Sequence, residues 1–110
     1  MIIDDDELDQ FEFLKDYNFI TVHVRPNMKL IPKINSVVPM LADIYEYLAF
    51  VGDDIICRTP WESRILEYLK SVPAGMVHTN TLDRPNVDEF ASHPIITSNM
   101  VRVLGFYGVP

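Results

Sequence analysis

Short apolar runs alternate along this chain with segments in which apolar residues recur every three or four positions. Short runs rich in β-branched and aromatic residues predict strands, whereas recurrence at three or four predicts amphipathic helices. We predict strands at 1–3, 19–24, 47–51, 74–79 and 94–96, helices at 7–16, 30–41, 60–71 and 97–104, and a polar, proline-containing loop at 80–92. Alternation of strands and helices predicts an α/β fold, with a mainly parallel sheet flanked by helices.

Several helix ends carry local signals. Thr59-Pro60-Trp61-Glu62 combines a threonine cap, a proline at the first helical position and a glutamate three residues after the cap. Thr97 or Ser98 is expected to cap the last helix and Gly105 to end it. Pro39 is expected to kink or shorten the helix at 30–41.

Composition narrows the classes of function. The 110 residues suit a single domain, 1–110, with enough apolar content for a core. A net charge of −7 and scattered basic residues argue against nucleic-acid binding. Cys57 is the one cysteine, and the sequence lacks an apolar run of about 20 residues and a signal peptide. These features favour a cytoplasmic protein without a membrane span.

The strongest chemical signal is Gly52-Asp53-Asp54, which directly follows the apolar run 47–51. Adjacent carboxylates repel each other unless a cation or hydrogen-bond donors compensate them. Hard oxygen ligands at a strand end suit Mg²⁺ or Mn²⁺ held together with a substrate's phosphates. The alternative is a simple turn in which the aspartates bond to local backbone.

Other candidate residues have both structural and functional interpretations. Arg58 balances the acidic charge or meets a phosphate, and Trp61 packs in the core or stacks on a sugar. His78 and His93 are hydrogen-bonded strand-end residues, metal ligands or bases. The acidic run 4–7 is a solvated helix start favoured by the helix dipole.

Taken together, the motifs 51–54, 58–59, 61–62, 93–95 and 104–106 resemble those of the GT-A glycosyltransferases, family 2-like nucleotide-diphospho-sugar transferases. The resemblance covers most of the chain, and the acidic pair is similar to the family's DxD-type metal motif. It implies that Asp53 and Asp54 bind Mn²⁺ or Mg²⁺, which bridges the diphosphate of a nucleotide-sugar donor. Asp54 is the better metal ligand, and Asp53 could instead contact the donor's sugar or ribose.

The same resemblance implies that the acidic end of the first strand lies near the nucleoside, with Asp4 or Asp6 in contact with it. The candidate donor-binding residues are therefore Asp53, Arg58, Trp61, Asp4 and Asp6.

The sequence departs from the family at both ends. Family members begin with a strand-loop-helix unit that holds the nucleoside base and continue into an acceptor region, and neither is recognisable here. The chain thus resembles the central part of a GT-A domain. Two functions stay open: a glycosyltransferase or its donor-binding part, and a non-catalytic, truncated module acting in binding or assembly. The second predicts a homo-oligomer that covers an open sheet edge.

Overall fold

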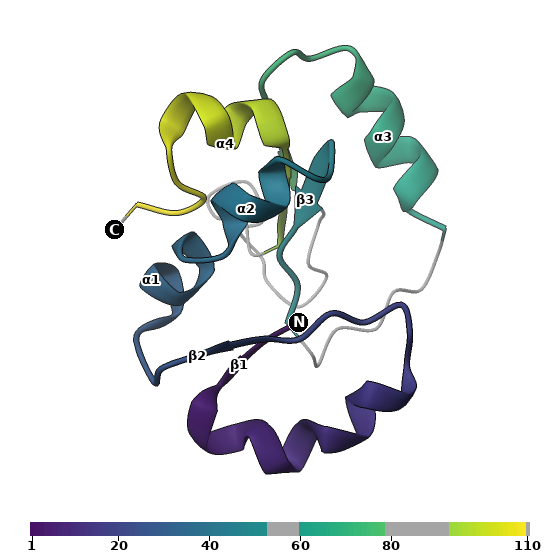
Figure 1. The fold of residues 1–110 in the computed structure, drawn as a ribbon. Coiled ribbons are helices and arrows are strands. Elements are labelled where there is room, and N and C mark those ends of the chain that lie inside the picture. Colours follow the sequence, from purple (N-terminus) through teal and green to yellow (C-terminus); the bar gives the residue numbers. More distant parts are fainter. Residues whose placement is uncertain (53–59, 79–92, 110) are drawn as a thin grey trace, which may run out of the picture.

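The structure is a computed structural model, which describes residues 1–52, 60–78 and 93–109 (Figure 1). The helices and strands within these ranges are, in chain order, β1 (Ile2–Asp4), η1 (Asp5–Asp16), β2 (His23–Arg25), α1 (Leu30–Asn35), α2 (Val38–Ala42), β3 (Tyr47–Ala49), α3 (Glu62–Lys70), β4 (Met76–His78), β5 (Pro94–Thr97) and α4 (Ser98–Leu104). The expected α/β class is confirmed. The predicted loop at 80–92 lies outside the described residues.

The strands form two separate sheets in the described part of the chain. β1 and β2 make a parallel pair, and β3, β5 and β4 make a three-stranded sheet with β5 in the middle, antiparallel to both neighbours. The sheet described is therefore not mainly parallel. The predicted parallel order rested on the alternation of strands and helices, but no helix was predicted between 74–79 and 94–96, and a parallel pair needs a crossover connection that is usually a helix.

Helices cover both faces of the three-stranded sheet (Figure 1). Consecutive residues of a strand point to opposite faces, and Ile95 and Ile96 of β5 accordingly belong to different apolar clusters. The cluster around Ile96 lies against α1, α2 and α4, and it consists of Ile34, Val38, Ala42, Leu48, Ile96 and Val101. The cluster around Ile95 lies against α3, whose Ile65 and Leu69 are buried there. Burial of each large aliphatic side chain stabilises the fold by about 1.5–3 kcal/mol.

The local signals around the last helix are confirmed. The Thr97 side chain accepts a hydrogen bond of 3.2 Å from the backbone N–H of Met100, as an N-cap residue should. Gly105 ends the helix with φ at 81°, in the left-handed region that glycine adopts without steric cost.

The expected effect of Pro39 is confirmed, whereas the expected start of the helix at 60–71 is not. Pro39 breaks the segment 30–41 into α1 and α2, because proline lacks the N–H that a continuous helix would use. α3 begins at Glu62, with Trp61 in the cap position. Pro60 is therefore not the first helical residue, and Glu62 is not the third residue after the cap, as had been predicted. Thr59, the expected cap, lies outside the described residues.

β2 is much shorter than the predicted strand 19–24. β1 offers only three residues, whose register pairs Ile2 with His23 and Asp4 with Arg25. Just before β2 the terminal amine of Met1 donates to the carbonyl oxygen of Thr21 at 2.7 Å, and further back Phe19 is exposed.

Candidate functional site

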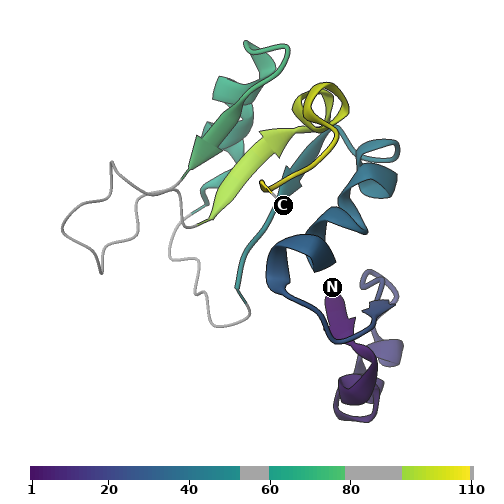
Figure 2. The same ribbon diagram turned by 90° about the vertical axis from the view of Figure 1, so that its left-hand side faces the viewer.

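The carboxyl ends of β3 and β4 and the amino end of β5 meet at one edge of the three-stranded sheet (Figure 2). The register pairs Ala49 with Ile95, and His78 with Pro94. β3 ends here at Ala49, and Gly52, the last described residue before the acidic pair, lies three residues further along the chain. In this antiparallel sheet the carboxyl ends of β3 and β4 therefore lie on either side of the start of β5.

The carbonyl oxygen of Pro94 anchors the chain that leaves β3. It accepts hydrogen bonds from the backbone N–H of Phe50 at 3.3 Å and from the Tyr107 hydroxyl at 2.8 Å. The rings of Phe50 and Tyr107 meet edge to face, with centroids 6.4 Å apart. Burial raises the pKa of Tyr107 to about 12, so the hydroxyl keeps its proton and remains a donor. Phe50, two residues before Gly52, is thereby held against both β5 and the C-terminal segment.

Asn35, the last residue of α1, holds this C-terminal segment in turn. Its Oδ1 accepts hydrogen bonds from the backbone N–H groups of Tyr107 at 2.9 Å and Gly108 at 3.2 Å. Its Nδ2 donates to the carbonyl oxygen of Gly108 at 2.8 Å. One side chain therefore satisfies three backbone groups of a segment that has no regular structure of its own.

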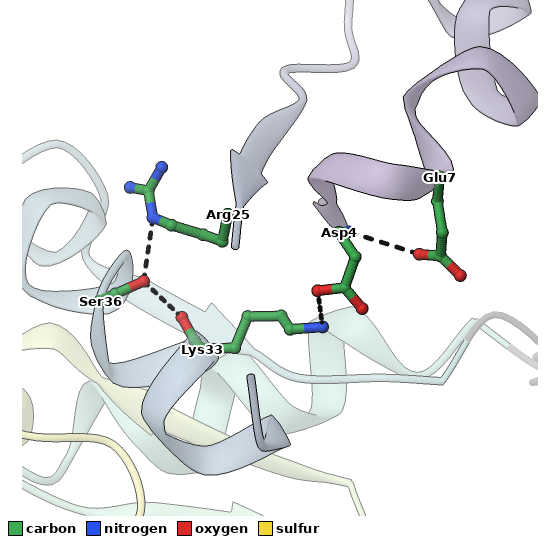
Figure 3. Close-up of polar contacts among 5 residues, drawn as sticks. All are labelled: Asp4, Glu7, Arg25, Lys33 and Ser36. Atoms are coloured by element: carbon green, nitrogen blue, oxygen red, sulfur yellow. Dashed lines mark hydrogen bonds and ion pairs between the residues drawn. The ribbon is translucent and has the colours of Figure 1, made fainter. Parts of the chain in front are cut away.

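Asp4, a candidate nucleoside contact, lies at the carboxyl end of β1 and forms an ion pair with Lys33 of α1 (Figure 3). Only 16% of the Asp4 side chain and 14% of the Lys33 side chain are exposed. The backbone N–H of Asp4 also donates to Glu7 Oε2 at 3.3 Å. The Asp4 carboxylate thus joins the two-stranded sheet to α1.

A second contact connects the same two parts. Arg25 of β2 donates from Nε to the Ser36 hydroxyl at 3.0 Å, just beyond the end of α1 (Figure 3). Both residues of the pair Asp4–Arg25, which lie opposite each other at the end of the β1–β2 sheet, therefore contact the α1 region.

Asp6 is exposed in the first turn of η1, beside Asp5 and Glu7. Its place agrees with a solvated acidic helix start, where negative charge is favoured by the helix dipole. No ion pair in the described residues involves Asp6. A contact with a nucleoside stays a prediction.

Trp61, the candidate sugar platform, precedes α3 and is partly buried. It packs against the apolar cluster of Ile65, Leu69 and Ile95. Packing in the core is one of the two roles that the sequence allowed for Trp61. Stacking on a sugar would use the part of the ring that the cluster leaves exposed.

The acidic pair itself, Asp53 and Asp54, lies outside the described residues, and so does Arg58. Across residues 1–52, 60–78 and 93–109, no group of three or more His, Cys, Asp or Glu side chains is arranged to hold a metal ion. His93 has a buried Nδ1 without a hydrogen-bond partner in these ranges, and His78 is exposed. Both histidines flank the sheet edge at which the acidic pair is expected.

Three residues that hold distant segments together were missed at the sequence level: Asn35 and Tyr107, which position this end of the sheet, and Lys33, which joins α1 to the β1–β2 sheet. Nothing in their local sequence marks them, because each acts on a segment distant in the chain. The polar positions of a predicted amphipathic helix are ordinarily solvated, and a buried lysine partner or a backbone clamp is evident only from packing.

Comparison with protein-family models, with curated proteins and with solved structures found no match for this chain. Among the described helices, none has the length and apolar character needed to cross a membrane.

Proposed function

We propose that this chain is the donor-binding part of a GT-A-like, metal-dependent glycosyltransferase. The observation that carries the proposal is the common edge of β3, β4 and β5, where the chain that leads into Gly52-Asp53-Asp54 is tied to Pro94. A strand followed by adjacent carboxylates at such an edge suits a cation that is shared with a diphosphate.

In the proposed reaction, a nucleoside diphosphate leaves the donor sugar and gains negative charge. A divalent cation held by Asp54, with Asp53 as second ligand or as sugar contact, would neutralise that charge. Arg58 would meet a phosphate, and Trp61 would stack on the sugar. Of the two candidate nucleoside contacts Asp6 is the better placed, because the Asp4 carboxylate is already paired with Lys33.

Isothermal titration calorimetry tests the proposal directly. We expect UDP or GDP to bind in the presence of Mn²⁺ and not in the presence of EDTA, and we expect Asp54→Ala to abolish binding. Asp16→Ala, which removes an equal charge from the exposed η1, is the matched control and should bind as the parent does. Absence of binding by the folded parent at millimolar nucleotide with Mn²⁺ would contradict the proposal.

A second candidate function is favoured by one observation. Within the described residues, β1 pairs with β2 alone and β3 pairs with β5 alone, so each has an edge without a strand partner. Unpaired edges template pairing with another chain. This supports the alternative of a non-catalytic module whose open edge is covered by a second copy.

The backbone pattern of β3 allows a sharp test of that alternative. The Glu46 carbonyl accepts from the N–H of Ser98, and the Phe50 N–H donates to Pro94, so both groups point toward β5. Because the backbone groups of successive residues in a strand point to alternate sides, the N–H of Ala49 points toward the open edge. Ala49→Pro removes this donor while leaving the bonds to β5 in place, and Ala49→Val is the control. An oligomer by light scattering that Ala49→Pro alone dissociates would support assembly, whereas a parent that is monomeric at high concentration would exclude it.

A further inference from the structure

η1 and the residues after it expose an unusual amount of aromatic surface. Phe13 is 56% exposed, Tyr17 46% and Phe19 80%. These rings occur in two pairs: Tyr17 and Phe19 meet edge to face with ring centroids 5.7 Å apart, and the ring centroids of Phe11 and Phe13 are 6.4 Å apart. Clustered exposed rings are typical of interaction surfaces, whereas single exposed apolar residues are ordinary.

The geometry of η1 sorts its side chains by chemistry. η1 is a 3₁₀ helix of 12 residues, in which residues three apart lie above one another. One row along the helix is Leu8, Phe11, Leu14 and Tyr17, and only Leu14 of this row is buried. The next row is Asp6, Asp9, Glu12 and Lys15, all exposed. The apolar row thus runs beside a row of three carboxylates and Lys15, and the third row, Glu7, Gln10, Phe13 and Asp16, places Phe13 next to both.

The length of this helix is itself a sign of an incomplete environment. Runs of 3₁₀ helix longer than three or four residues are uncommon, because their hydrogen-bond geometry is poorer than that of an α-helix. Here Leu14 is the one buried residue of the helix, and Glu7 accepts a hydrogen bond from the backbone of Asp4 at its start. A partner that covers the aromatic residues would supply the packing that η1 lacks.

Charge decides which kind of partner fits. The helix carries six carboxylates and one lysine. A nucleic acid or an anionic lipid surface would be repelled, and a second copy of this chain would bring the same acidic row and a net charge of −7. A protein segment that combines apolar anchors with Lys or Arg side chains complements both rows at once.

We propose that the η1 face, made of Phe13, Tyr17, Phe19 and the acidic row Asp6, Asp9 and Glu12, is a docking surface for a basic, amphipathic segment of another protein. The apolar side chains of that segment cover the aromatic residues, and its basic side chains pair with the carboxylates. The proposal does not depend on nucleotide binding, since the η1 face and Gly52 belong to separate parts of the described structure.

Fluorescence anisotropy on the full chain tests this surface with a labelled amphipathic leucine–lysine peptide of about 15 residues, and with its leucine–glutamate counterpart. We expect the lysine peptide to bind and the glutamate peptide not to bind. The double variant Phe13→Ser/Phe19→Ser should weaken binding by at least about tenfold. Asp9→Asn/Glu12→Gln should weaken it severalfold and reduce its dependence on salt.

Matched controls come from elsewhere on the surface. Val103→Ser removes an equally exposed apolar side chain from α4, and Asp43→Asn removes an exposed carboxylate beyond α2. Both should bind the peptide as the parent does, and circular dichroism should show every variant folded. Equal weakening by the controls, binding of the glutamate peptide, or no binding of the lysine peptide would each overturn the proposal.

Discussion

The Tyr107 hydroxyl donates a hydrogen bond of 2.8 Å to the carbonyl oxygen of Pro94, which joins the C-terminal segment to the first residue of β5. The same oxygen accepts the N–H of Phe50, where the chain leaves β3 toward the acidic pair. Three segments that are distant in sequence therefore meet at one carbonyl. This relationship makes Tyr107 a positioning residue of the candidate donor edge.

Replacing Tyr107 by phenylalanine should lower the free energy of unfolding by about 1 kcal/mol, because one buried hydrogen bond is lost while the ring contact with Phe50 is kept. Urea denaturation measures the change. Tyr68→Phe, at an exposed position of α3, is the control and should leave stability within about 0.5 kcal/mol of the parent. Equal stability of the Tyr107 variant and the parent would mean that the bond contributes nothing.

Asn35→Ala should destabilise the protein by about 2–3 kcal/mol. It removes the partners of the N–H groups of Tyr107 and Gly108 and of the Gly108 carbonyl, and partly buried groups without partners cost more than the bonds themselves contribute. Asn35→Asp keeps the acceptor for both N–H groups and should cost only about 1 kcal/mol. Thermal or urea unfolding distinguishes them, and an aspartate variant as unstable as the alanine variant would contradict the clamp.

Lys33→Met should destabilise the protein by about 2 kcal/mol, since it leaves the largely buried Asp4 carboxylate without its cation. The double variant Asp4→Asn/Lys33→Met should recover most of that loss, because the charge that needs a partner is gone. Lys15→Met tests the opposite case: its ion pair with Glu12 is exposed on both sides, so the urea midpoint of this variant should equal that of the parent. A double variant no more stable than Lys33→Met would rule out the pairing argument.

His23 should make stability depend on pH in one window. Burial, then the positive N-terminus of the chain and Arg25, hold the pKa of His23 below its ordinary value of 6.5 in the folded protein. The unfolded chain therefore binds the proton first as the pH falls, and stability decreases from the unfolded pKa downward until the folded pKa is passed. The difference in stability between parent and His23→Gln should be constant above about pH 7 and change below it. A difference independent of pH from 7 to 4 would show that the folded and unfolded pKa values are equal.

The candidate site was predictable only in its chemistry. Gly52 and its following carboxylates stand out by residue type, and a strand ending just before them was expected and is present as β3. Which strands end beside Gly52 was not predictable, because it depends on β5 lying between β3 and β4. Asp4 shows the converse, since a carboxylate selected for a ligand proves to be paired with Lys33.

The sequence by itself determined the features that arise from neighbouring residues: a cap at Thr97 or Ser98, the end of α4 at Gly105 and the break near Pro39. Each rests on backbone sterics or on a hydrogen bond across a few residues, which local sequence specifies. Only the tertiary structure decided the direction of strand pairing, the division into two sheets and the clamp of Asn35 on Gly108, 73 residues away. Such contacts form because packing brings distant segments together. The local pattern of a helix or strand does not specify which distant segment will pack against it.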